Sequence, residues 1–273
     1  MKKAILGAAL LLSPLLALAQ NWPVTVTDLD NRAVTIAHEP QRIILQDGRD
    51  ILTLAVLERE NPFAKVVAWN NLPKKQDSQT WDVLKRKWPE ADKILDMQFS
   101  DQGNVDLETI LSRHPDLMIA QLRAKPSLTQ SGVLAKLEAL HVPVVFVDYE
   151  LHPVENTRPS IALLGKVLGQ SARAQAYLDF YQQRLDLLHQ RLANVKKKPL
   201  VFIEPIAGVA GLDNGCCFTH AHNGWGGLVE AAGGENIGSQ LLPGATGNVS
   251  VEKIISMNPA YYLMTCLLYT SDA

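Results

Sequence analysis

The sequence predicts an α/β protein in which two similar parallel-sheet lobes are joined by a long rigid helix. Short runs of β-branched and apolar residues alternate with helical segments, which is typical of parallel strands covered on both faces. Residues 104–120, NVDLETILSRHPDLMIA, return in altered form at 248–264, NVSVEKIISMNPAYYLM. Between these copies, residues 156–196 carry almost no strand pattern. We therefore expect two lobes of the same architecture, with helices between them.

The repeat predicts the same local structure in each copy, namely a short helix that leads into a buried strand. Asp106 and Ser250 occupy the positions that cap a helix, and a proline precedes each apolar run. The matching residues are Asn104, Val105, Glu108, Ile110, Ser112 and Pro115 in the first copy, and Asn248, Val249, Glu252, Ile254, Ser256 and Pro259 in the second. Helix, proline and strand are common in any α/β layer, so an unrelated origin stays open, but a duplicated lobe accounts better for so long a match.

The first nineteen residues have the features of a secretory signal peptide. Two lysines precede the apolar run 4–18, and Ala-Leu-Ala at 17–19 is a small-x-small cleavage site. A membrane anchor is the alternative, but the run is shorter than the roughly 20 residues of a membrane span. Residue 20 is Gln and not Cys, which argues against a lipid anchor. We expect an exported, soluble protein of the periplasm.

Composition excludes some functions and leaves others open. A formal net charge of −2 gives no basic surface for nucleic acid. A hydrophobic content of 47% allows two lobes to bury substantial cores. The cysteines Cys216, Cys217 and Cys266 are too few for a disulfide framework. The adjacent pair could form a strained disulfide or remain two thiols.

The elements follow in order along the chain. Residues 24–37 alternate apolar and polar around a turn, which predicts a hairpin. The runs RIILQ, KVVAW, DLMIA and PVVFV predict the strands of a first lobe spanning 20–152. Residues 153–198 predict linking helices, the second with an apolar stripe from Tyr177 to Leu192. The run PLVFIEP opens a second lobe, 199–265.

The end of the chain does not continue either pattern. After its first repeat copy the sequence adds a helix and a strand, whereas few residues follow the second copy. The run CLLYTSDA at 266–273 resembles translated adapter sequence. We expect these eight residues to be non-native and the second lobe to be truncated.

Four segments in this order resemble the periplasmic binding proteins of ABC importers for iron complexes, haem and cobalamin. They are VTVTDLDNRAVTIAHEPQRIILQ, the repeated unit, the helix after LGQSARA, and EAAGGENIG. The resemblance covers residues 24–264 and implies a protein that holds a ligand between two lobes joined by a long helix and delivers it to an inner-membrane permease. We expect the protein to be a monomer. It also implies that a glutamate on each lobe docks on permease arginines. Glu235 matches the position on the second lobe, with an ordinary exposed glutamate as the alternative, and no residue of the first lobe is assigned.

The predicted ligand site follows from the sheets. In open parallel sheets, ligands bind outside the carboxyl ends of the strands. Arginine and aromatic side chains suit a large, flat, anionic metal chelate, since they supply charge-assisted hydrogen bonds and stacking. The residues after these strands that we expect to contact the ligand are Arg49, Trp69, Arg123 and Tyr149 in the first lobe, and Glu204, His220, His222 and Trp225 in the second. Trp69 could instead belong to the core.

Residues 213–227, DNGCCFTHAHNGWGG, form the most unusual stretch. Two histidines two residues apart follow two cysteines, yet the spacing matches none of the usual zinc signatures, and the glycines indicate a mobile loop. We expect no metal site of the protein's own. Direct metal binding and a purely structural loop remain alternatives to a role in contacting a bound complex.

The leading hypothesis is a binding protein for a ferric siderophore, without a cofactor or catalytic residues of its own. Haem or cobalamin would suit the same class of protein, and free zinc or manganese is a weaker alternative. A secreted metal-dependent hydrolase built on Glu204, His220 and His222 is the competing class. No Gly-x-Ser-x-Gly, His-Glu-x-x-His or phosphate-binding glycine loop supports that hydrolase.

Overall fold

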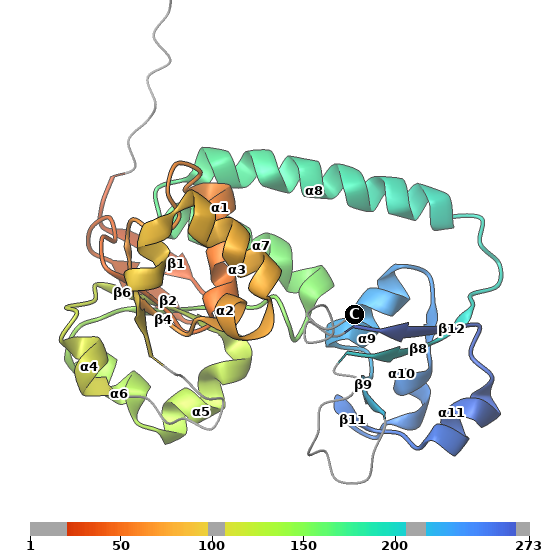
Figure 1. Cartoon of the computed structure of the whole chain (residues 1–273). Coiled ribbons are helices and arrows are strands. Elements are labelled where there is room, and N and C mark those ends of the chain that lie inside the picture. Colours follow the sequence, from red (N-terminus) through yellow and green to blue (C-terminus); the bar gives the residue numbers. More distant parts are fainter. Residues whose placement is uncertain (1–20, 98–106, 206–216, 266–273) are drawn as a thin grey trace, which may run out of the picture.

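The computed structural model describes residues 21–97, 107–205 and 217–265 (Figure 1). The expected signal peptide, the cap Asp106, Cys216, Cys266 and the tail 266–273 lie outside these residues. Among the described residues, no helix is both long enough and apolar enough to cross a bilayer.

The first lobe is built on a sheet of five parallel strands in the order β5-β4-β3-β6-β7. The four strands that the sequence predicts are present, and the short β5 adds an edge. The antiparallel hairpin of β1 and β2 is also confirmed. The bounds are β1 (Val24–Thr27), β2 (Ala33–Ile36), β3 (Ile43–Leu45), β4 (Val66–Trp69), β5 (Leu95–Asp96), β6 (Leu117–Gln121) and β7 (Val144–Val147).

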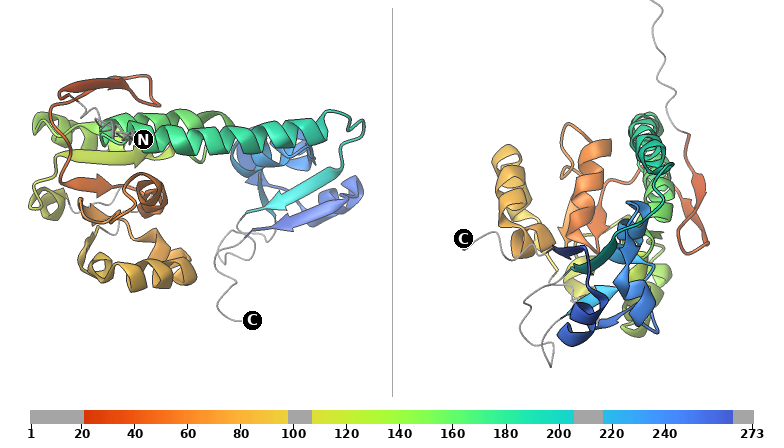
Figure 2. Two further views of the ribbon diagram at one scale, coloured as in Figure 1. Left: turned by 90° about the horizontal axis from the view of Figure 1, so that it is seen from above. Right: turned by 90° about the vertical axis from the view of Figure 1, so that its right-hand side faces the viewer.

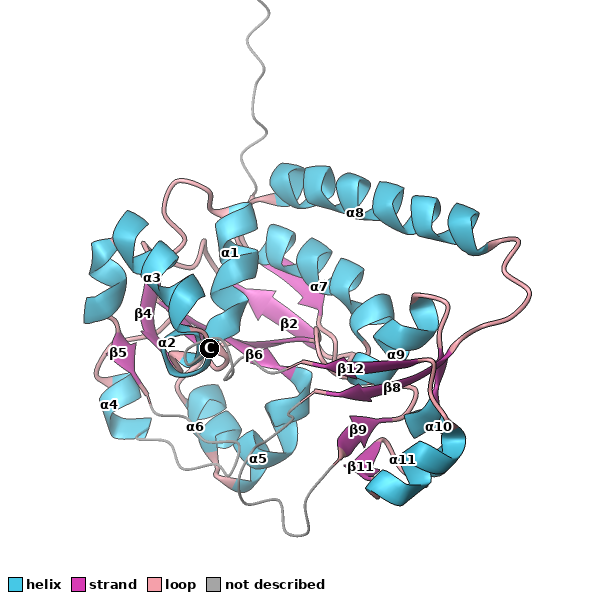
Figure 3. Ribbon diagram, turned by 45° about the vertical axis from the view of Figure 1, so that its right-hand side comes forward, coloured by secondary structure: helices cyan, strands magenta, loops and turns pink. Residues whose placement is uncertain are grey.

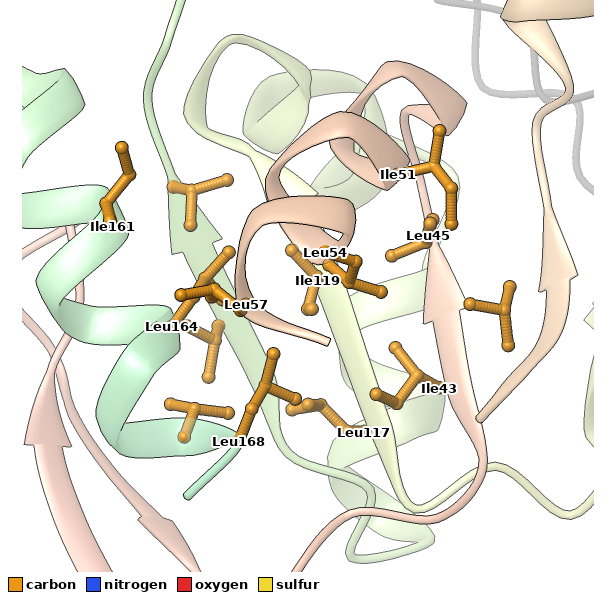
Figure 4. Packing of buried hydrophobic residues seen from close by; sticks show 14 of the residues in the cluster. Ile43, Leu45, Ile51, Leu54, Leu57, Leu117, Ile119, Ile161, Leu164 and Leu168 are labelled. Carbon is orange, nitrogen blue, oxygen red and sulfur yellow. The ribbon is translucent and has the colours of Figure 1, made fainter. Parts of the chain in front are cut away.

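Helices cover both faces of this sheet (Figure 3). Side chains alternate along each strand, so Ile43 and Leu45 join one core cluster while Ile44 joins the other. The first cluster includes residues of α1, α3, α7 and α8, and Figure 4 shows Leu54, Leu57, Ile161 and Leu164 against the sheet. The second includes residues of α4, α5 and α6. The helices of this lobe are α1 (Ile51–Leu57), α2 (Leu72–Gln76), α3 (Ser78–Lys87), α4 (Leu107–Leu111), α5 (Lys125–Gln130) and α6 (Val133–Ala139).

Two helices lead from the first lobe to the second, α7 (Pro153–Val167) and α8 (Ser171–Leu192). The 22 residues of α8 correspond to about 33 Å of helix. Its buried residues, Ala174 and Leu178, lie in the half that packs on the first lobe. Figures 1 and 2 show its other half extending toward the second lobe. The long linking helix predicted from the sequence is therefore confirmed.

The second lobe repeats the arrangement on a smaller scale. A parallel sheet has the order β10-β8-β12, and β9 pairs antiparallel with β11. The repeated helix and strand pairing is confirmed, since β6 pairs with β3 as β12 pairs with β8, and a helix precedes each. The prediction of a buried strand is confirmed for β6 and wrong for β12, whose four residues are exposed because no further strand pairs with it and no helix covers it among the described residues. Ser250 caps its helix by accepting from the Lys253 N–H at 3.3 Å. The elements are β8 (Leu200–Glu204), β9 (Phe218–His220), α9 (Gly224–Ala231), β10 (Glu235–Asn236), α10 (Ile237–Leu241), β11 (Thr246–Asn248), α11 (Val251–Met257) and β12 (Tyr261–Met264).

The lobes meet where α7 begins and α9 begins. The N–H of Gly224 donates to the carbonyl oxygen of Leu151 at 2.9 Å. Gly224 has a φ of +51°, which lies in the left-handed region that favours glycine. This contact places the loop after β7 directly against the turn between β9 and α9.

Candidate functional site

Two arginines meet at the carboxyl edge of the first sheet. Arg49 lies in the 3-10 turn Gly48–Asp50 after β3, and Arg123 lies in the 3-10 turn Leu122–Ala124 after β6. Because β3 and β6 are neighbouring parallel strands, the two turns lie side by side. The guanidinium groups of both arginines donate to Oδ2 of Asp47, at 2.5 Å and 3.0 Å respectively. The structure thus brings together two of the predicted ligand residues.

Asp47 anchors this pair from within the protein. Its side chain is 1% exposed, and its Oδ1 also accepts from the backbone N–H of Arg49 at 2.9 Å. Burial raises the pKa of the Asp47 carboxyl, but the hydrogen bonds and positive charge of Arg49, with the charge of Arg123, outweigh burial and hold the pKa below its usual range. Asp47 is therefore the ionised partner that keeps both guanidinium groups in place.

A buried polar layer lies beneath the arginines. Nε2 of Gln121 donates to Oδ1 of Asp50 at 2.5 Å, and Oε1 of Gln121 accepts from the N–H of Tyr149 at 3.3 Å. Burial, with the charge of Asp47, raises the pKa of Asp50 well above its usual range. Burial, with the charge of Asp50, raises the pKa of Tyr149. The predicted residue Tyr149 thus packs its ring against the core, and its N–H joins this polar layer.

Glu150 completes the cluster, and sequence reasoning missed it. Its Oε1 accepts from Arg49 and its Oε2 pairs with Arg123, so it contacts both arginines. Its position is set by Asp148, whose Oδ1 accepts from the Glu150 N–H at 3.0 Å. A single glutamate after a strand is an ordinary surface feature, so only the meeting of three loops reveals its contacts.

Trp69 is a correction to the predicted site. Its side chain is 0% exposed and packs edge-on to Phe63, with ring centroids 5.5 Å apart, and against Trp81 at 5.8 Å. A residue at the end of a strand can face either the loops or a core, and this one faces the core. Trp69 offers no surface to a ligand in this structure and belongs to the core, the alternative that the sequence left open.

In the second lobe, Glu204 ends β8 at the corresponding carboxyl edge. It is 7% exposed, and its Oε2 accepts from the hydroxyl of Tyr262 on β12. Burial, together with Glu204, raises the pKa of Tyr262. Glu204 therefore lies at the predicted edge but is held inward by a tyrosine.

The two predicted histidines have different environments. His220 ends β9, is half-buried, and packs edge-on to Phe218 at 5.4 Å, and burial lowers its pKa. A Cβ on Gly224 would lie 2.3 Å from its Nδ1 and 3.2 Å from the carbonyl oxygen of Glu150. Gly224 thus lies between the ring of His220 and the backbone of Glu150.

His222 is 75% exposed, and its Nδ1 pairs with both carboxylate oxygens of Glu230, at 2.9 and 3.1 Å. Across the described ranges, with their gaps, no three His, Cys, Asp or Glu side chains converge as a metal site would require. The prediction of a mobile loop at residues 213–227 is partly wrong, because residues 218–220 form β9 and residues 224–231 form α9. Cys217 is buried and disulfide-bonded.

The two remaining predicted residues are on the surface. Trp225, in the first turn of α9, is 43% exposed and lies beside the contact between the lobes. Glu235 is exposed on β10 and accepts from Nε2 of Gln240 at 2.8 Å. Both positions are accessible to a partner molecule.

Comparisons with known proteins identify a family and several structures of similar fold. A family model described as periplasmic binding protein matches residues 44–273. No curated protein matches the sequence significantly.

Solved structures of similar fold include a TroA-like periplasmic binding protein, FepB, from Veillonella parvula, with a TM-score of 0.74 and 23% identity over 89% of this chain and 69% of that one. The molybdate-bound MolA of Haemophilus influenzae has a TM-score of 0.67 and 19% identity over 88% and 73%. CeuE of Helicobacter pylori in a nickel-histidine complex has a TM-score of 0.67 and 18% identity over 89% and 71%. At these identities the likeness shows the fold alone.

Proposed function

The chain belongs to the periplasmic binding protein family, and we propose that it binds a ferric siderophore or related iron complex between its two lobes. The protein would reach the periplasm by its signal peptide and act there as a monomer. It would deliver the complex to an inner-membrane ABC permease, with Glu235 as one docking residue. Haem and cobalamin are alternative ligands within the same transport class.

The arginine pair carries the proposal. Arg49 and Arg123 are held by one buried carboxylate at the sheet edge where ligands bind in open parallel sheets. Their side chains remain 38% and 22% exposed, so part of each guanidinium group is accessible. Hydrogen bonds to charged groups contribute about 1.5–3 kcal/mol each, which suits the recognition of an anionic chelate.

The contact between the lobes supports the same location. His220 and Gly224 approach Glu150, and Trp225 lies next to Gly224 with an exposed indole. This contact beside the loop that carries Glu150 supports a ligand site formed by both lobes. A hydrolase built on His220, His222 and Glu204 has no such support, since His222 pairs with Glu230 and Glu204 with Tyr262.

The experiment is a tryptophan-fluorescence titration of the protein from residue 20 with ferric hydroxamate, ferric catecholate, ferric citrate, haem, cobalamin and zinc. We expect saturation at one equivalent by one iron complex. The variants Arg49→Gln and Arg123→Gln should each weaken that binding about tenfold or more. The exposed Arg86 provides the matched control Arg86→Gln, which should change affinity less than twofold. Equal affinities for all four proteins would contradict the proposed site.

A further inference from the structure

Glu150 is the second carboxylate that contacts both arginines, in addition to Asp47. One of its carboxylate oxygens contacts Arg49 and the other contacts Arg123, so it bridges the two guanidinium groups. The Glu150 side chain is 31% exposed, whereas that of Asp47 is 1% exposed. Asp47 is thus the internal anchor, and Glu150 is the carboxylate of the cluster that is accessible from outside.

The backbone of Glu150 is fixed while its side chain is not enclosed. The carboxylate of Asp148 accepts from the N–H groups of Glu150, Leu151 and His152, at 3.0, 2.8 and 3.1 Å, and from Nδ2 of Asn156 at 2.7 Å. Four hydrogen bonds to one buried carboxylate make this turn rigid. Movement of the Glu150 carboxylate therefore requires rotation of its side chain only.

The charges of the cluster balance in this arrangement. Two guanidinium groups face two carboxylates, so an approaching anion meets arginines that are already neutralised. Glu150 itself would repel that anion at short range. An anionic ligand gains the full attraction of Arg49 and Arg123 only after the Glu150 side chain has moved aside.

From this geometry we infer that Glu150 is an internal competitor, which holds the place that a carboxylate of the ligand takes between Arg49 and Arg123. The ligand class that fits is a ferric chelate carrying free or bridging carboxylates, such as ferric citrate. This inference rests on the proposed function and adds that the site prefers iron chelates that carry a carboxylate. Ligands without a carboxylate would leave Glu150 in place and gain little from the arginines.

The ionisation of Glu150 supports this reading. Burial raises its pKa, the charges of Arg123 and Arg49 act in the opposite direction, and the charge of Asp47 raises the pKa again, so that the pKa lies above its usual range. The arginines therefore do not fully offset the cost of holding this carboxylate ionised. Moving the Glu150 carboxylate into water would remove this cost of burial. The Asp47 carboxylate, whose pKa is lowered, would gain nothing from such a move.

The test compares Glu150→Gln with the wild-type protein, using ferric citrate and a neutral ferric trihydroxamate as probes in calorimetric titrations. We expect the variant to bind ferric citrate at least tenfold more tightly and the trihydroxamate within twofold of wild type. Glu138 is an exposed glutamate of α6 in the same lobe, so Glu138→Gln is the matched control and should change neither affinity beyond twofold. Glu150→Ala removes the competing group altogether and should show the gain in citrate affinity even where the glutamine side chain still occupies the place between the arginines.

The outcomes separate this inference from the proposed function. Unchanged or weaker citrate binding by both Glu150 variants would overturn the inference, and Glu150 would then be a ligand contact. Binding of the trihydroxamate alone, by wild type and variants equally, would also overturn it and leave the proposed function standing. If no iron complex binds any of the proteins, the proposed function fails and this inference fails with it.

Discussion

Arg49 and Arg123 donate to the same oxygen, Oδ2 of Asp47, although they follow different strands of the sheet. One buried carboxylate therefore sets the spacing of two guanidinium groups. The relationship makes Asp47 the residue on which the geometry of the proposed site depends most.

Replacing Asp47 with Asn should destabilise the protein and weaken chelate binding. Removing one partner of a buried ion pair costs about 3–5 kcal/mol, and the partial exposure of both arginines reduces this to about 1–3 kcal/mol here. Urea unfolding at pH 7 measures the loss, with Asp82→Asn on the exposed face of α3 as control.

The same variant has a defined pH dependence. The pKa of Asp47 is lowered on folding, so its contribution to stability is present above the unfolded-state pKa and disappears as the pH falls through the folded-state pKa. The stability gap between wild type and Asp47→Asn should therefore close in acid. A gap that persists below pH 2 would show that the loss is one of packing.

Asp50 should affect stability in the opposite sense. Its pKa is raised by burial first and by the charges of Asp47 and Glu150, while Gln121 and Arg49 lower it. The folded state thus holds the proton more tightly than the unfolded state, and stability falls as the pH rises above the usual range of an aspartate. Unfolding free energies from pH 4 to 8 should decline more steeply for wild type than for Asp50→Asn. Parallel curves would mean that Asp50 ionises normally.

The tryptophans should respond differently to solvent and ligand. Trp225 is 43% exposed, whereas Trp69 is 0% exposed. Trp225→Phe should reduce acrylamide quenching and remove most of the chelate-induced fluorescence change, whereas Trp69→Phe should alter neither. A chelate-induced fluorescence change that is lost in Trp69→Phe and kept in Trp225→Phe would show that Trp69, and not Trp225, reports ligand binding.

Gly226 should tolerate no side chain. A Cβ there would lie 1.8 Å from the carbonyl oxygen of Ala221 and 2.4 Å from Nδ2 of Asn236, which also donates to the carbonyl oxygens of His220 and Ala221. Gly226→Ala should cost about 3 kcal/mol of unfolding free energy. Gly244, with nothing within 4 Å of its Cβ position, gives the control Gly244→Ala, which should remain close to wild type. Equal stability of the two variants would mean that α9 can shift freely.

Local patterns predicted much of the fold, because each predicted element depends on neighbouring residues. The repeat, the hairpin and α8 all follow from periodicity and from proline or turn residues near in sequence. Arg49 and Arg123 could also be predicted as site residues. Ligands bind at the carboxyl ends of parallel strands, so the positions of the strands in the sequence are sufficient to find them.

The rest depends on contacts between distant segments. Trp69 appeared at a strand end like the arginines, but its orientation is decided by packing against Phe63 and Trp81. Glu150 carries no motif, and its meeting with Arg49 and Arg123 requires three loops to converge. His222 looked like a neighbour of His220 because they are close in sequence, yet Glu230 binds it on the surface.

The hydrogen bond from the Gly224 N–H to the Leu151 carbonyl oxygen joins the residue before Trp225 to the residue after Glu150. Because four hydrogen bonds to Asp148 hold the turn that carries Leu151, this bond fixes the start of α9 against the first lobe. The exposed side chain of Trp225 therefore sits on a part of the second lobe whose position is set directly by the first.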